Sequence, residues 1–182
     1  LALNGVFPDA IPDLRREFAD LLPHQHIHTW HALTSVSAAN AGFDARRVAS
    51  ELVREEAFAQ IKPDIVHVSS LFEGLGDDAV TNVHALNMST TAVTLYDLIP
   101  LIHSQQYLGD PTISRWYYQK IQALKNADLL LAISSSSREE ALTWLQSPPA
   151  NVVNISSAVD ERFAKTEYAP EVLRELLLRY GL

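Results

Sequence analysis

The stretch Val93-Thr94-Leu95-Tyr96-Asp97-Leu98-Ile99-Pro100-Leu101 decides how the rest of the sequence is interpreted. Val93 and Leu95 are apolar and threonines accompany them, so residues 91–96 are predicted to form a buried strand. The strand ends in Tyr96-Asp97, and Pro100 is expected to prevent both a continued strand and a smooth entry into a helix. Polar groups at the carboxyl ends of strands in an open α/β sheet face the ligand crevice. Tyr96 and Asp97 are therefore predicted to contact ligand hydroxyl groups.

Strand and helix patterns alternate along the whole sequence. Strands are expected at 1–7, 26–30, 65–68, 91–96, 127–133 and 151–155, and helices at 14–22, 43–60, 77–86, 110–126, 134–146 and 170–180. This alternation predicts an α/β, Rossmann-like domain whose mainly parallel sheet has helices on both faces. We expect that domain to span residues 1–156, with an interdomain linker and a terminal helix at 157–182.

The composition excludes several classes of function. The 182 residues carry a net charge of −8, from 22 acidic and 14 basic side chains, which argues against nucleic acid as a partner. The absence of cysteine excludes disulfides, thiolate metal sites and cysteine nucleophiles. No apolar run reaches the roughly 20 residues that span a bilayer, so we expect a cytoplasmic protein that contacts membranes at most peripherally.

Other polar groups follow the predicted strands. Phe72-Glu73-Gly74 comes after the strand at 65–68 and is predicted to share a crevice with Asp97, although a solvated loop would also explain Glu73. Ser134 and Ser135 open a helix and could hold a phosphate or sugar hydroxyl, or serve only as N-caps. His103, in the loop after Pro100, could donate to an acceptor hydroxyl.

Two weaker patterns were weighed against these. Residues 74–79 formally match a dinucleotide fingerprint, but Asp77 and Asp78 would repel a pyrophosphate at a helix start. His24, His26 and His28 would share one face of a strand and could bind zinc, yet no carboxylate or cysteine is interleaved. We expect neither a bound cofactor nor a metal.

Four motifs in sequence order carry a resemblance to a known family. They are Ser69-Ser70-Leu71-Phe72-Glu73-Gly74-Leu75, Val93 to Pro100, Ala127 to Ser134 with Ser137-Arg138-Glu139, and Val152 to Phe163. Together they resemble the acceptor-side half of family 4 retaining glycosyltransferases of the GT-B type. The most similar group is that of bacterial mannosyltransferase-like enzymes that build surface polysaccharides.

This resemblance implies transfer of a sugar, with mannose the expected one, from a nucleotide-sugar to a polysaccharide or lipid-linked glycan acceptor. Tyr96-Asp97 then matches a catalytic His-Asp position, with tyrosine in place of histidine, and Phe72-Glu73-Gly74 faces the acceptor. Ser157-Ala158-Val159-Asp160 replaces the usual Asn-Gly-Val-Asp. The family also has a central strand with a Gly-rich turn before the segment at Leu1, and a C-terminal donor domain after Leu182.

Three functional hypotheses follow. The first is the acceptor half of a glycosyltransferase, which we expect to be inactive without its donor domain. The second is a non-catalytic domain that binds a glycan or a partner enzyme, which the substitutions at Tyr96 and 157–160 favour. The third is an oxidoreductase with a nucleotide cofactor, which the fingerprint at 74–79 favours.

Overall fold

The computed structural model describes residues 1–40, 42–83, 89–163 and 168–181, and confirms the predicted α/β class. Its strands and helices are β1 (Ala2–Asn4), α1 (Ala10–Glu17), β2 (His28–Trp30), α2 (Asp44–Ile61), β3 (Ile65–Val68), β4 (Thr90–Leu95), α3 (Ile99–Ile102), α4 (Ser104–Tyr107), α5 (Pro111–Lys125), β5 (Leu129–Ala132), α6 (Ser135–Glu140), β6 (Val152–Asn154) and α7 (Pro170–Tyr180). Short 3-10 turns lie at His24–His26, Pro149–Asn151 and Glu161–Phe163, and a π-helical turn, Ala141–Leu145, extends α6.

The main sheet is parallel throughout and has the order β3-β4-β5-β6. β4 and β5 are paired on both sides, and their side chains Val93, Leu95 and Ala132 are at most 1% exposed. Leu98 and Leu124 pack into the same core cluster. Strands covered on both faces need apolar side chains at successive positions. The apolar runs in this part of the sequence therefore predicted the strands correctly.

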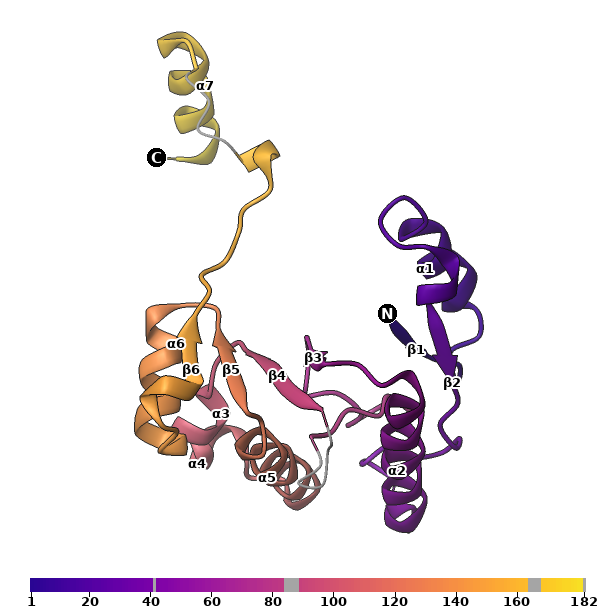
Figure 1. Cartoon of the computed structure of the whole chain (residues 1–182). Helices are drawn as coiled ribbons and strands as arrows, with labels where there is room; N and C mark the ends of the chain where they lie inside the picture. The colour runs from indigo at the N-terminus through magenta and orange to yellow at the C-terminus, as the bar shows by residue number, and fades with distance from the viewer. Residues whose placement is uncertain (41, 84–88, 164–167, 182) are drawn as a thin grey trace.

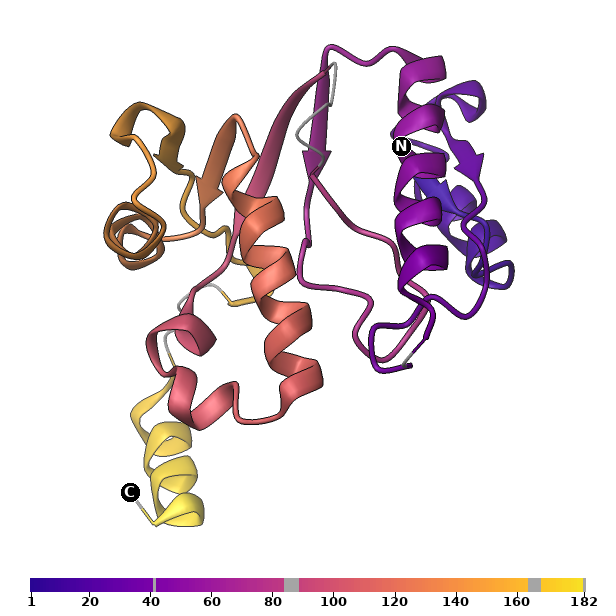
Figure 2. The ribbon, with the colours of Figure 1, turned by 90° about the horizontal axis from the view of Figure 1, so that it is seen from below.

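The first two strands form a separate parallel pair, β1-β2, in place of the single sheet that was expected. In Figure 1 the pair stands beside β3 without joining it, with α1 above and α2 below. In Figure 2 the arrows of β2, β3 and β4 all point down the page, so both sheets have their carboxyl ends at one edge of the molecule. A second, small core cluster of Trp30, Val36 and Val80 lies here.

Helix α5 follows the sequence pattern closely. Asp110 caps it, because its carboxylate accepts hydrogen bonds from the backbone N–H of Thr112 (2.7 Å) and Ile113 (3.0 Å), and Pro111 occupies the first helical position. Its buried side chains Tyr117, Ile121 and Leu124 face the sheet.

Helix α2 departs from its pattern. The apolar residues Val48, Leu52 and Val53 are exposed, whereas Ser50 and Arg54 are buried. Ser50 accepts a hydrogen bond from the Leu33 N–H (3.0 Å). Buried polar groups need such partners, so the helix turns its polar side inward where partners are available.

Several predicted elements are wrong in extent or kind. Helix α1 begins earlier than the expected 14–22, because Pro12 is tolerated in a first turn. Residues 77–83 are not helical, because the Asp77 and Asp78 carboxylates bind backbone N–H groups of non-helical segments; the rest of that predicted helix, 84–88, lies outside the described residues. Pro100 does not prevent a helix: it sits in the first turn of α3, where its missing N–H costs no bond.

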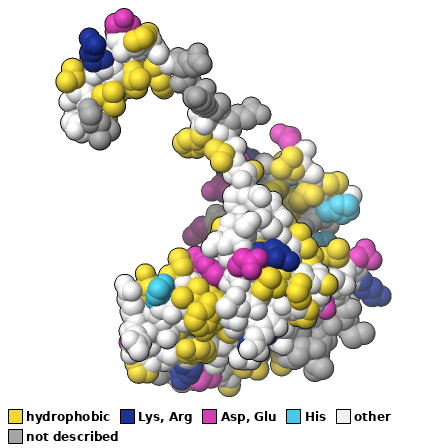
Figure 3. All heavy atoms as spheres, turned by 90° about the vertical axis from the view of Figure 1, so that its left-hand side faces the viewer, with side chains coloured by type: hydrophobic (Ala, Val, Ile, Leu, Met, Phe, Trp, Pro, Cys, Tyr) yellow, Lys and Arg dark blue, Asp and Glu magenta, His cyan; other side chains and the backbone are white. Residues whose placement is uncertain are grey.

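The C-terminal part of the chain extends away from the body as a linker followed by α7 (Figure 1). Gly181, with φ of +69°, ends this helix, as its position after the apolar pattern predicted. None of its described residues is buried, and Figure 3 shows hydrophobic side chains gathered on it. Within the described residues, no helix combines the length and apolar character needed to cross a membrane.

Candidate functional site

The carboxyl ends of β3, β4 and β5 lie at one edge of the main sheet. The registers Val68 with Val93 and Leu95 with Ala132 align the strands, so the segments that follow them emerge together. Those segments contain the predicted site residues Phe72-Glu73-Gly74, Tyr96-Asp97 and Ser134-Ser135. The predicted groups therefore share an edge of the sheet, the usual place for ligands in open α/β folds.

The turn after β4 exposes both predicted catalytic side chains. Tyr96 is 54% exposed, and Asp97 is exposed while its Oδ1 accepts the Ile99 N–H (3.0 Å). Helix α6 holds the backbone of this turn: Ser137 Oγ donates to the Tyr96 carbonyl (2.5 Å), and Glu140 Oε2 accepts the Leu98 N–H (2.8 Å). These contacts fix the backbone and leave the phenol and carboxylate directed outward.

The loop after β3 is equally constrained. Ser70 Oγ donates to Glu73 Oε1 (2.6 Å), and Trp116 Nε1 donates to the Glu73 carbonyl (3.2 Å). Gly74 has φ of +82°, and a Cβ there would lie 2.3 Å from the Ala79 carbonyl oxygen, so only glycine fits. The Glu73 carboxylate thus has a defined position although its side chain is exposed.

Tyr117 of α5 connects these two segments. Its ring packs on Phe72 with centroids 5.1 Å apart. Burial and, to a smaller extent, the negative charge of Asp97 raise the pKa of Tyr117 to about 12. The Tyr117 ring therefore contacts the segment after β3, and the register of β3 with β4 brings the turn after β4 to the same edge of the sheet.

The remaining predicted residues have other partners. Ser134 is the N-cap of α6, because its Oγ accepts the Ser137 N–H (3.0 Å), and Ser135 Oγ accepts from Asn154 Nδ2 (3.0 Å). The N-cap interpretation of Ser134 is thus confirmed, and ligand binding by these hydroxyls stays a prediction. His103 is exposed at the junction of α3 and α4, and no hydrogen bond in the described region joins its side chain to Tyr96 or Asp97.

Sequence reasoning did not predict the role of three residues that shape this edge: Trp116, Glu140 and Ser137, of which only Ser137 was noted, as part of a family motif. Ser137 and Glu140 are three residues apart, a spacing that places both on one face of a helix, and this could have indicated a joint role. The aromatic run from Trp116 to Tyr118 near the start of α5 was a second available signal. Phe72 and Trp116 meet edge to face, with centroids 6.3 Å apart, and form an aromatic border beside Glu73.

Neither the dinucleotide fingerprint nor the histidine cluster has the structure that its ligand would require. The fingerprint at 74–79 opens no helix over residues 77–83. Burial alone would raise the pKa of Asp78, but backbone N–H groups of Ser35, Val36 and Ser37 outweigh it and lower that pKa, so Asp78 anchors a loop. The expected histidine strand is also wrong, because His24 and His26 lie in a 3-10 turn and β2 starts at His28. Among the described residues, no group of histidines and carboxylates could hold a metal ion.

Comparison with known proteins finds relatives that share one name. The whole chain is 34% identical, over 184 aligned residues, to proteins named serotype-specific mannosyltransferase WbdA from Escherichia coli. The alignment covers 100% of this chain and 22–23% of the WbdA proteins, so the chain spans about a quarter of their length. No protein-family model matches the chain. The chain is thus a relative of a glycosyltransferase along its full extent.

Proposed function

We propose that residues 1–182 form the acceptor-side half of a retaining glycosyltransferase of the GT-B type. The reaction would move mannose from a nucleotide-sugar to a polysaccharide or lipid-linked glycan. The observation that carries this proposal is the 34% identity to mannosyltransferases over the whole chain. The clustering of Glu73, Tyr96 and Asp97 at one edge of the sheet supports it, because these groups hydrogen-bond hydroxyls well.

The chemistry of the edge suits a sugar acceptor. A hydroxyl nucleophile needs an acceptor for its proton and a fixed orientation. Asp97 would accept a hydroxyl hydrogen, and Tyr96 can donate to a second oxygen. The aromatic border of Phe72 and Trp116 offers an apolar surface for the C–H face of a sugar ring, while Glu73 beside it binds a further hydroxyl.

The donor would be held mainly by a second domain. Transfer requires stabilisation of a leaving nucleotide diphosphate, which takes cations or a helix N-terminus directed at the phosphates. Two carboxylates dominate the edge described above, so it is suited to hydroxyl groups and unsuited to phosphates. We therefore expect residues 1–182 alone to transfer no sugar.

The test is Asp97→Ala in the intact gene product that contains residues 1–182. We expect transfer to fall by about 100-fold or more, as is typical when a group in proton transfer is removed, with donor affinity nearly unchanged. Initial rates with a radiolabelled nucleotide-sugar give the first quantity, and titration calorimetry with the donor gives the second.

The matched control is Asp64→Ala. Asp64 is also an exposed aspartate, but it precedes β3 and lies at the opposite edge of the sheet. Its replacement should leave transfer unchanged. Equal losses in the two variants, or a loss of donor affinity in Asp97→Ala, would contradict the acceptor-side assignment.

A further inference from the structure

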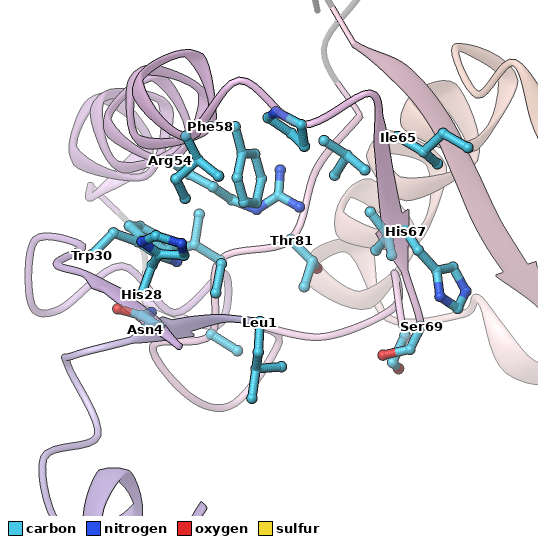
Figure 4. A pocket seen from close by; sticks show the side chains of 18 of the residues that line it. Leu1, Asn4, His28, Trp30, Arg54, Phe58, Ile65, His67, Ser69 and Thr81 are labelled. Atoms are coloured by element: carbon cyan, nitrogen blue, oxygen red, sulfur yellow. The ribbon is translucent and has the colours of Figure 1, made fainter. Parts of the chain in front are cut away.

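Two cavities flank the segment 79–83, which leads towards β4 without forming a helix. Figure 4 shows the first, of about 450 Å³, between β1 and β3, where apolar side chains such as Phe58, Ile65 and Val66 line it. The second, of about 430 Å³, lies between α2 and α5 and is lined mainly by polar residues. Ligand sites usually occupy roughly 300–1,000 Å³, and only the second cavity offers enough hydrogen-bonding groups for a polar ligand. We call it the interhelix groove.

The connection from β3 to β4 forms the floor of the interhelix groove. Lys120 of α5 donates to Thr81 Oγ1 (2.8 Å), and Asn82 Nδ2 donates to Glu51 Oε2 of α2 (2.9 Å), so the connection is tied to both helices. In Figure 2 it passes between α2 and α5. A helix in this position would fill the space between them with its side chains, since a helix with side chains is about 10 Å across. The non-helical segment leaves that space open.

One end of the groove adjoins the candidate site. Glu73, Gly74 and Trp116 line the groove, and the hydrogen bond from Trp116 Nε1 to the Glu73 carbonyl (3.2 Å) joins a wall that the groove shares with the aromatic border. From Trp116 the groove follows α5 as far as Asn126, which is about 15 Å at 1.5 Å per residue. A ligand bound at the Glu73 carboxylate can therefore extend from the edge of the sheet into the groove.

The walls of the groove carry hydrogen-bonding groups that the fold does not use. Gln119 and Gln122 of α5 are exposed, and within the described parts of the chain no hydrogen bond engages their side chains. Each amide can donate and accept, as a sugar hydroxyl does. On the α2 side, Arg47 pairs with Asp44 through Nη2, while its Nη1 is buried without an acceptor in the described structure. A buried donor without a partner is costly, and a ligand oxygen would satisfy it.

The charges of the groove favour a neutral ligand. The carboxylates of Asp44, Glu51 and Glu73 line it. They outnumber the cations of Arg47 and Lys120, which line it as well. A phosphate or another anion would therefore meet more negative than positive groups and would be repelled. Hydroxyl groups suit the same lining, because they donate to carboxylates and accept from amides, ammonium and guanidinium groups.

We propose that the interhelix groove binds the part of the acceptor glycan beyond its reacting end, as neutral hexose units. This inference rests on the proposed function, because it takes the reacting hydroxyl to lie beside Glu73 and Asp97. The amides of Gln119 and Gln122 would bind ring hydroxyls, and the Trp116 ring would contact the apolar face of a sugar at the entrance. The groove would thereby favour acceptors that are long enough to reach it.

The first test measures sugar transfer to acceptors of increasing length by the intact gene product that contains residues 1–182. The probes are mannose and linear oligosaccharides of two, three and four mannose residues, with a radiolabelled nucleotide-sugar as the donor. We expect kcat/KM to rise about 10-fold or more from the shortest to the longest acceptor, because only the longer ones gain contacts in the groove. An equal kcat/KM for all four acceptors would overturn the inference.

The double variant Gln119→Ala/Gln122→Ala removes both free amides from the groove, and both positions are exposed, so the fold should tolerate it. We expect kcat/KM for the four-residue acceptor to fall about 10-fold, as the loss of two ordinary hydrogen bonds would cause, and the loss to shrink as the acceptor is shortened. The matched control is Gln60→Ala, which removes an exposed amide of α2 that does not line the groove. Equal losses for every acceptor length, or equal losses in the control, would contradict a glycan subsite.

Binding measured without a donor separates this inference from the proposed function. Titration calorimetry with the four-residue acceptor should give a Kd about 10-fold higher for Gln119→Ala/Gln122→Ala than for the unsubstituted protein. The same acceptor with a diazirine on the sugar furthest from the reacting hydroxyl should label peptides covering 44–51 or 116–126. An unchanged Kd, or labelling confined to other peptides, would overturn the inference even if the protein transfers sugar. Labelling of these peptides by a protein that transfers no sugar would support the glycan site and contradict the proposed function.

Discussion

The β3-β6 sheet and the β1-β2 pair are made from the same ingredients, parallel strands joined by helices, yet they differ in completeness. The strands β4 and β5 have neighbours on both sides, and their core includes buried residues from every strand of that sheet. The pair β1-β2 contributes one strand residue, Trp30, to a buried cluster with Val36 and Val80, and this cluster borders a cavity of about 450 Å³ between β1 and β3. Layers on both faces bury the side chains of a parallel strand, and the small cluster shows that fewer apolar side chains cover the β1-β2 pair than cover the main sheet.

The largest expected difference between the two regions lies in the cost of a cavity. Val93→Ala, in β4, should lower the free energy of unfolding by about 2–3 kcal/mol, because both the buried methyl groups and the packing around them are lost. Val36→Ala should cost only about 1 kcal/mol, although Val36 is 1% exposed, because its small cluster can collapse towards the cavity between β1 and β3. Urea titrations of residues 1–182 measure both values.

The same two variants can also contradict the proposed difference in packing between the two regions. Equal losses would mean that the β1-β2 region is as well packed as the main sheet.

Helix starts give a second, smaller contrast. Asp110→Ala should lower the free energy of unfolding by about 1 kcal/mol, because two backbone N–H groups of α5 lose their acceptor. Asp44→Ala at the start of α2 should cost less, since Phe43 occupies the cap position there and no side chain caps the helix. Thermal unfolding followed by circular dichroism distinguishes them, and Asp110→Asn, which keeps a cap acceptor, should be nearly neutral.

The effect that is smallest at neutral pH concerns Lys120, which ties α5 to the loop before β4 by donating to Thr81 Oγ1 (2.8 Å). Burial lowers the pKa of Lys120 to about 8, against 10.5 for an ordinary lysine. The unfolded chain therefore binds more protons between pH 8 and 10.5, and native stability contributed by this group rises with pH across that window. Near pH 7 the slope is close to zero.

Comparison with Lys120→Met isolates this titration. The wild-type protein should gain stability relative to the variant from pH 8 to 10.5, by at most about 1.4 kcal/mol per pH unit. Denaturant titrations at four pH values give the difference. A flat difference would show that Lys120 is solvated, and a falling one would mean that its ammonium is stabilised by the fold.

The extent to which sequence predicted structure differs between the same two regions. The β4, α5 and β5 segments were predicted within a few residues, since their apolar pattern and the Asp110-Pro111 cap act locally. The α2 pattern gave a correct helix with a wrong face, because the Leu33 N–H and the Asn82 carbonyl meet Ser50 and Arg54 from distant parts of the chain. The helix predicted from residue 77 was wrong over 77–83 for a similar reason, because the Asp78 carboxylate accepts a hydrogen bond from backbone more than 40 residues away.

The candidate site shows the same division. The positions of Glu73 and Asp97 at strand ends could be predicted, because a strand followed by a polar turn is a local signal. Their support could not be predicted in full. Ser137 reaches the Tyr96 carbonyl across 41 residues, and Trp116 reaches the Glu73 carbonyl across 43.

The sequence by itself determined that this chain alternates strands and helices, where most of them lie, and which polar groups end the strands. Those features follow from side-chain periodicity, caps and turns, which act over a few residues. Only the tertiary structure decided that the strands divide into two sheets, that α2 turns Arg54 inward, and that Tyr117 packs on Phe72. Strand pairing and burial depend on contacts between segments that are distant in the sequence, and no local pattern specifies such contacts.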